Sequence, residues 1–104
     1  MRTITYSFLS TNGEHFEEAV ADRLFLEGEE LEALIESTFN ARRAFAFTNR
    51  EGRTQTYLRT YLNGEAYYLG FTIEDDELVL RTALTQGMHE YNLENHDLEE
   101  LEII

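Results

Sequence analysis

The chain has 104 residues, of which 42% are hydrophobic, and it contains neither cysteine nor proline. This length supports one hydrophobic core, so we expect a single domain over residues 1–104. The lack of cysteine excludes disulfides and cysteine-based zinc sites. The 21 acidic residues outnumber the 8 basic ones, all arginine, and give a formal net charge of -13. A charge of this sign repels nucleic acid at long range and attracts basic surfaces.

Apolar and polar side chains alternate over residues 2–9, with Ile4, Tyr6 and Phe8 on one side. This period of two predicts a half-buried strand. A signal peptide would carry a continuous apolar segment here, and the longest apolar runs in the chain span only a few residues. We therefore expect a cytoplasmic protein that does not associate with membranes.

The spacing of Thr11 and Glu14 is that of a capping box, in which a threonine hydroxyl and a glutamate satisfy backbone donors at a helix start. Apolar residues recur at helical spacing after this point, up to Asn40, which is a candidate left-handed cap. Gly28 interrupts the pattern. We expect two short helices in this region, or one helix broken at Gly28.

Alternation returns after the helices and predicts four more strands. They lie near residues 42–48, 53–62, 65–73 and 77–84, with turns at 49–52, 63–64 and 75–76. The acidic tail after Gly87 contains a candidate helix over residues 97–102. The sequence therefore predicts an α+β fold in the order β-α-α-β-β-β-β: an antiparallel β-meander of about five strands, two helices packed on one face, and a C-terminal acidic tail or short helix.

The two-residue turn at Asn63 and Gly64 fixes the register of its strands and places Tyr57 opposite Gly70. One face of the sheet then gathers apolar residues, and the helices should cover it: Phe45, Phe47, Leu58, Leu62, Tyr67, Leu69, Phe71, Ile73, Leu78, Leu80 and Leu84. The other face gathers arginines, tyrosines and small residues: Arg42, Ala44, Ala46, Gln55, Tyr57, Arg59, Tyr61, Ala66, Tyr68, Gly70, Val79, Arg81 and Ala83.

The arginines of this second face need an anion nearby, because a four-residue loop at Asn49 would place Arg42 directly opposite Arg59. One source is the acidic tail, whose carboxylates belong to Glu90, Glu94, Asp97, Glu99, Glu100 and Glu102. The other source is an external anion, with arginines binding phosphate and tyrosines stacking on bases. The sheet-face residues for that role are Arg42, Tyr57, Arg59, Tyr61, Tyr68 and Arg81.

The order of one strand, two helices and an antiparallel meander with arginines on its open face is similar to that of the RelE-type endoribonuclease toxins. The resemblance covers the topology and no motif. It implies RNA cleavage, and by position the catalytic residues would be Arg59, Arg81, His89 and Tyr91.

The chain shows no motif for a metal site or a phosphate-binding loop. The three histidines, His15, His89 and His96, are far apart in sequence, and His89-Glu90 lacks the second histidine of a zinc-protease helix. The glycines are isolated, so none belongs to a phosphate-binding loop. We therefore expect neither a metal site nor a cofactor.

The leading hypothesis is a small acidic protein, more a binding protein or inhibitor than an enzyme, of the immunity, anti-defence or nucleic-acid-mimic type, from a phage or a prokaryote. It would occupy the basic surface of a nucleic-acid-handling protein, as a monomer or homodimer, without binding nucleic acid directly. The predicted partner-binding residues are Glu14, Glu17, Glu18, Asp22, Glu29, Glu30, Asp75, Asp76 and Glu77. The alternatives are a RelE-like endoribonuclease or RNA- or nucleotide-binding module, and an acidic protein of a salt-adapted cell with an unrelated function.

Overall fold

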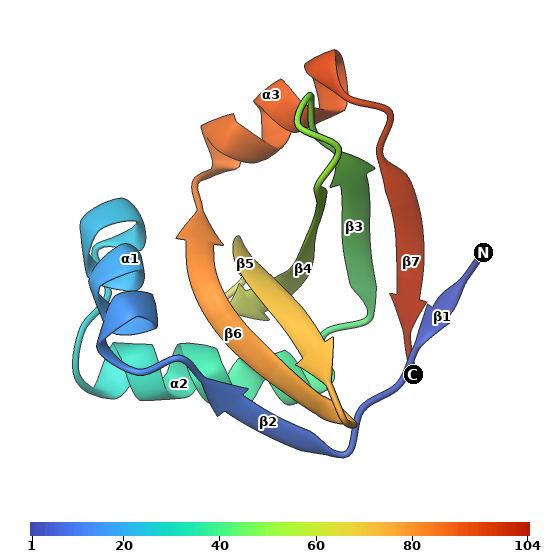
Figure 1. Cartoon of the computed structure of the whole chain (residues 1–104). Helices are drawn as coiled ribbons and strands as arrows, with labels where there is room; N and C mark the ends of the chain where they lie inside the picture. The colour runs from blue at the N-terminus through green and yellow to red at the C-terminus, as the bar shows by residue number, and fades with distance from the viewer.

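A computed structural model describes all of residues 1–104 and places seven strands in one mixed sheet, with three α-helices around it (Figure 1). The α+β class is as predicted. Along the chain the elements are β1 (Thr3–Ile4), β2 (Phe8–Thr11), α1 (Glu14–Leu24), α2 (Glu29–Ser37), a 3-10 turn (Thr38–Asn40), β3 (Arg43–Thr48), β4 (Thr54–Leu62), β5 (Glu65–Glu74), β6 (Glu77–Leu84), α3 (Gln86–Asn95) and β7 (Glu99–Ile103).

The meander of β3, β4, β5 and β6 is antiparallel throughout, which confirms the central part of the prediction. Asn63 and Gly64 both have positive φ, as a two-residue hairpin turn of the favoured hand requires. The turn fixes the predicted register, in which Tyr57 lies opposite Gly70. Asp75 and Asp76 close the next hairpin with the same backbone geometry.

The sheet is strongly curled, because its two edge strands are neighbours in sequence. β1 pairs in parallel with β7 at one edge, and β2 pairs in parallel with β6 at the other. A flat sheet of seven strands would be about 29 Å wide. The four residue steps from Ile4 to Phe8 reach at most about 15 Å. The single strand predicted over residues 2–9 is therefore wrong: the chain bends between β1 and β2 and leaves Phe8 exposed.

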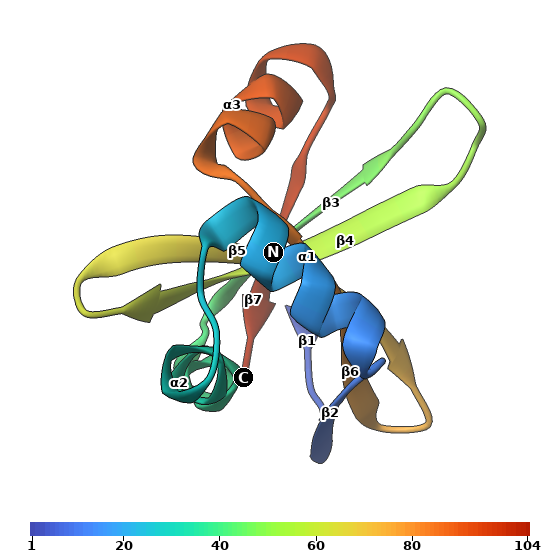
Figure 2. The same cartoon turned by 90° about the vertical axis from the view of Figure 1, so that its left-hand side faces the viewer.

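The main core fills the concave side of this curl, and α1 and α2 cover it (Figures 1 and 2). Phe16 and Val20 of α1 and Leu34 of α2 are fully buried there. They pack with strand residues such as Leu58 and Leu69, which the sequence had placed on the helix-covered face. The prediction of two helices on one face is thus correct, and the third helix lies on the other face.

The register between β3 and β4 differs by one residue from the prediction. Five residues connect these strands, because Thr48 pairs with Thr54. The Asn49 side chain accepts hydrogen bonds from two backbone amides of the loop, and Gly52 adopts a positive φ. These features stabilise the longer loop. A shift of one residue moves every side chain of β3 to the opposite face of the sheet. Phe45 and Phe47 therefore leave the main core, and Ala44 and Ala46 are buried toward it.

A β-bulge likewise exchanges the faces of the sheet to which the last side chains of β6 point. Gly70 pairs with Thr82, whereas its neighbour Phe71 pairs with Leu80, so Arg81 is the extra residue. Beyond the bulge, Ala83 is buried in the main core and Leu84 packs on the opposite face, the reverse of the prediction.

Two local predictions about element ends are also wrong. Thr11 is the last residue of β2, and its hydroxyl accepts from the Gly13 amide instead of capping α1. The left-handed residue of the helical region is Phe25, at the end of α1, and not Asn40.

The candidate helix over residues 97–102 is a strand instead. β7 is inserted between β1 and β3 because Leu101 and Ile103 alternate with glutamates and are buried in the core. The helix of the tail comes earlier, as α3, and the Thr85 side chain caps it by accepting from the Met88 amide.

Candidate functional site

Helix α3 covers part of the sheet face that the sequence offered as an open arginine and tyrosine surface (Figure 1). Phe45, Tyr57 and Tyr68 are buried there against His89 of α3. The Tyr68 and His89 rings stack with centroids 4.2 Å apart, and the Tyr57 hydroxyl lies 2.7 Å from His89 Nδ1. We call these four residues the tyrosine–histidine cluster.

Burial sets the protonation states within this cluster. It lowers the pKa of His89, and the nearby Arg59 guanidinium lowers it further. Burial also raises the pKa of Tyr57, which the neighbouring Asn92 amide partly offsets. The phenol is therefore protonated and the imidazole neutral at pH 7, and the imidazole tautomer decides which of the two donates the hydrogen bond. Because Tyr57 is only 1% exposed and His89 5%, this pair is a structural contact and not an accessible acid–base couple.

A pH-dependent loss of stability is expected from His89. Its folded-state pKa lies below the ordinary value of 6.5, so the unfolded chain binds protons more readily as the pH falls. The stability that His89 contributes to the folded state is fully present above about pH 6.5. It is lost as the pH falls from there toward the pKa of His89 in the folded state. The free energy of unfolding of wild type, minus that of His89→Asn, should therefore decline over this range in urea titrations. Parallel curves for the two proteins would contradict the assignment.

Two carboxylates of the tail form ion pairs with one arginine of this sheet face. The residue opposite Arg59 is Arg43 and not Arg42, because of the shifted register. Arg43 forms ion pairs with Glu100 at 3.3 Å and with Glu102 at 3.6 Å, both on the adjacent strand β7. The tail thus supplies negative charge to Arg43 by joining the sheet, whereas the three arginines named in the prediction, Arg42, Arg59 and Arg81, form no ion pair with a tail carboxylate.

The other arginines each have a different neighbour. Arg42 donates to the carbonyl groups of Phe39 and Ala41. Arg59 lies over the rings of Phe45 and Tyr61. The guanidinium of Arg81 donates to two side chains on the adjacent strand β5, those of Thr72 and Glu74.

The four residues of the endoribonuclease alternative are not gathered into one site. Arg59 on β4 and Arg81 on β6 are separated by β5 and by an offset of three residues along β6, since Tyr68 lies between Arg59 and Leu84. His89 is buried, whereas Tyr91 is exposed on the same helix.

The predicted partner-binding acids fall into two groups. Six of them lie on the exposed surface of the helices: Glu14, Glu17, Glu18 and Asp22 on α1, and Glu29 and Glu30 on α2. The others, Asp75, Asp76 and the half-buried Glu77, lie at the β5–β6 turn, at the far end of β2 from α1 (Figure 1). The structure therefore places six of these acids on two consecutive helices and the other three apart from them.

Two further acids, Glu32 and Glu36, are exposed on α2 and were missed, although their helical spacing from Glu29 could have found them. With the six above they define what we call the acidic face. None of these eight carboxylates forms an ion pair, since every ion pair of the chain involves Glu74, Glu99, Glu100 or Glu102. The one arginine of these helices, Arg23, donates to Thr82 and Ala83 at the edge of β6 instead.

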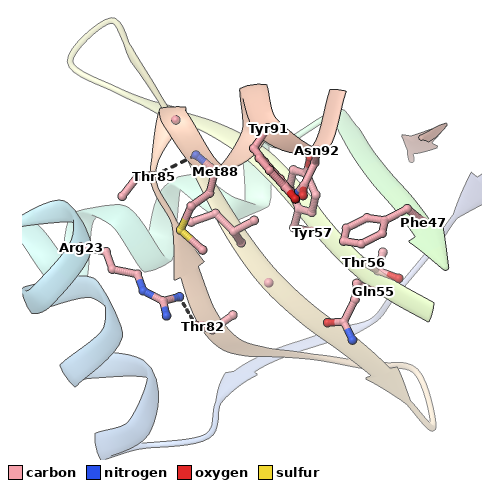
Figure 3. Close-up of a pocket in the computed structure, with 13 residues that line it drawn as sticks. Arg23, Phe47, Gln55, Thr56, Tyr57, Thr82, Thr85, Met88, Tyr91 and Asn92 are labelled. Carbon is pink, nitrogen blue, oxygen red and sulfur yellow. Dashed lines mark hydrogen bonds between the residues drawn. The ribbon is translucent and has the colours of Figure 1, made fainter. Parts of the chain in front are cut away.

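A hollow of about 620 Å³ lies between α3, the convex face of the sheet and Arg23 (Figure 3). We call it the α3 pocket. Its lining comes from five separate parts of the chain: Arg23, Phe47, Gln55, Thr56, Tyr57, Gly70, Thr82, Leu84, Thr85, Gly87, Met88, Tyr91 and Asn92. The sequence analysis did not find this pocket, because only the shifted register and the bulge place Phe47 and Leu84 beside Tyr57.

No group of three or more histidine, aspartate and glutamate side chains is arranged to hold a metal ion. None of the helices combines the length and apolar character needed to cross a membrane. Comparisons with protein-family models, with curated proteins and with solved structures gave no match to this chain.

Proposed function

We propose that this protein is a small acidic binding protein of the inhibitor type, which uses its acidic face to occupy a basic surface of another protein. The observation that carries the proposal is the absence of any ion pair among the eight carboxylates of α1 and α2. Surface carboxylates without internal partners leave their negative potential available to a basic partner and speed its association. A nucleic-acid-handling protein offers such a surface, because it neutralises phosphates with lysine and arginine.

An exposed aromatic side chain lies at the end of α1 within this acidic surface. Phe25 is 83% exposed and has a φ of 59°, a backbone conformation that L-residues other than glycine adopt at a cost. Aromatic residues are frequent anchors at the centres of interfaces. We assign Phe25 to the interface as its apolar contact, because it follows the acids of α1 and precedes those of α2 in the chain.

The proposal places the protein in the cytoplasm of a prokaryote, or of a cell infected by a phage that encodes it, where its partner would meet nucleic acid. Its action requires no catalysis: the carboxylates would compete with phosphates for the partner's cations. The endoribonuclease alternative has weaker geometric support, because β5 separates Arg59 from Arg81 and His89 is buried.

Affinity capture with a matched pair of charge-reversal variants tests the proposal. Glu18→Lys/Asp22→Lys reverses two acids one turn apart on α1. Glu90→Lys/Glu94→Lys reverses two exposed acids at the same spacing on α3 and changes the net charge equally. From extracts of cells that carry the gene, wild type and the α3 variant should capture the same basic protein, and the α1 variant should lose it. Equal capture by all three proteins would refute the use of the acidic face.

A further inference from the structure

We propose that the α3 pocket is a binding site for a small aromatic compound with a single negative charge, such as an arylacetic acid. This site lies apart from the acidic face and does not depend on its function. Its volume, about 620 Å³, is within the range of about 300 to 1,000 Å³ that is usual for small-molecule pockets.

The charge of the residues that line the pocket limits the charge that a ligand can carry. None of the thirteen lining residues is acidic, in a chain with 21 acidic residues, and the only formal charge is that of Arg23. A cationic ligand would therefore meet no counter-charge. A ligand with several negative charges would find one arginine only, and the net charge of -13 would oppose its approach. These two limits leave a neutral or singly anionic compound, and Arg23 favours the anion.

The Arg23 side chain is already held at the pocket. Its Nη1 donates to Ala83 O at 2.7 Å and to Thr82 Oγ1 at 3.2 Å. It forms no ion pair with any carboxylate of the chain, and its Nε and Nη2 donate no hydrogen bond within the protein. These groups can donate to a carboxylate, and guanidinium geometry suits a planar carboxylate well.

The other end of the pocket is aromatic. Figure 3 shows Arg23 on one side of the hollow and Phe47 and Gln55 on the other, with Tyr57 and Tyr91 between α3 and the sheet. Tyr57 is buried, so Phe47 and Tyr91 are the accessible aromatic walls, and such walls bind flat rings by stacking and edge contacts. The separation of cation and aromatic residues suits a ligand with a ring at one end and a carboxylate at the other.

Part of the pocket wall is held in place by contacts within the protein. Tyr57 is held by its hydrogen bond to His89, and Thr85 caps the helix that carries Met88. Packing is tight at Gly70, where an added Cβ would meet Thr82 Cγ2 at 2.5 Å. A preformed site loses less conformational entropy on binding than one that must order itself.

Three indole compounds that differ in charge test this site: indole-3-acetate, indole-3-acetamide and tryptamine. Binding is followed by NMR titration of the ¹⁵N-labelled protein. We expect the acetate to bind with a dissociation constant of about 1 mM, usual for a fragment of this size, and to shift the amide signals of lining residues. The amide should bind about tenfold more weakly, because it loses the charge-assisted hydrogen bonds to Arg23, and tryptamine more weakly still.

Two variants and a control make the outcome decisive. Arg23→Gln should abolish the preference for the acetate over the amide, whereas Arg81→Gln, which lies outside the pocket, should keep it. Tyr91→Ala should remove an exposed aromatic wall of the pocket and weaken the binding of all three compounds. The site is overturned if no lining signal moves with the acetate, if the three compounds bind equally to wild type, or if Tyr91→Ala leaves acetate binding unchanged. Amide spectra of each variant verify that it is folded.

Discussion

Replacing Leu101 with alanine is expected to lower the free energy of unfolding by about 2 to 5 kcal/mol, the cost of a cavity in a core. Leu101 is 4% exposed and lies on β7, which joins β1 to β3 at the edge of the sheet. Leu93→Ala is the matched control, because Leu93 lies on α3 and is 55% exposed. Urea unfolding should show a large loss for the first variant and a change within about 0.5 kcal/mol for the second.

Truncation after Leu98 should have a stronger effect for the same reason. It removes β7, exposes the backbone groups of β1 and β3 that were paired with it, and deletes the carboxylates bound to Arg43. We expect a protein without a cooperative unfolding transition. A truncated chain that unfolds cooperatively, together with a neutral Leu101→Ala, would show that the last strand is not part of the core.

Removing charge from the acidic face is expected to stabilise the isolated protein. Three like-charge pairs on these helices are spaced by four residues: Glu14 with Glu18, Glu18 with Asp22, and Glu32 with Glu36. Each such pair costs about 0.2 to 0.5 kcal/mol, so Glu18→Gln/Glu36→Gln should raise the free energy of unfolding by about 1 kcal/mol at low salt. The gain should vanish near 1 M salt, where charges are screened.

The control variant removes acids whose negative charge stabilises the helix because of their position. Glu17→Gln/Glu30→Gln removes two carboxylates from the first turns of α1 and α2, where the helix dipole favours negative charge. This variant should be no more stable than wild type. If both variants gained equally, the effect would come from net charge alone and would not identify pairs on the acidic face.

Short, distinctive turns made the central hairpins predictable from the sequence. Asn63-Gly64 has one favoured geometry, so the pairing of Tyr57 with Gly70 followed directly. The Asn49 loop admits either four or five residues, and the choice depends on hydrogen bonds of the Asn49 side chain that the pattern does not reveal. One residue of difference reversed β3 and moved Phe45 and Phe47 to the other face.

The tail was ambiguous because its pattern fits two structures. Leu98 and Leu101 are spaced for a helix, whereas Leu101 and Ile103 are spaced for a strand. Pairing with β1 and β3 decided in favour of the strand, and these long-range contacts are not visible in local sequence.

The acidic helices were predictable as a surface, because charge and helical period coincide in α1 and α2. The α3 pocket was not, since Arg23 reaches it from α1 and the remaining lining residues come from four other parts of the chain. Its assembly depends on the bulge at Arg81 and on where α3 packs, two features without a sequence signature that we could identify.

The association rate of the captured partner, measured across a salt series, tests the acidic face most directly. Screening shortens the Debye length from about 10 Å at 0.1 M to about 3 Å at 1 M salt. We expect the rate for wild type and for Glu90→Lys/Glu94→Lys to fall steeply over this range, as in electrostatically steered association. Glu18→Lys/Asp22→Lys should associate slowly at low salt and depend less on salt. A rate for wild type that does not change with salt, or an α1 variant that matches wild type throughout, would contradict the proposed role of the acidic face.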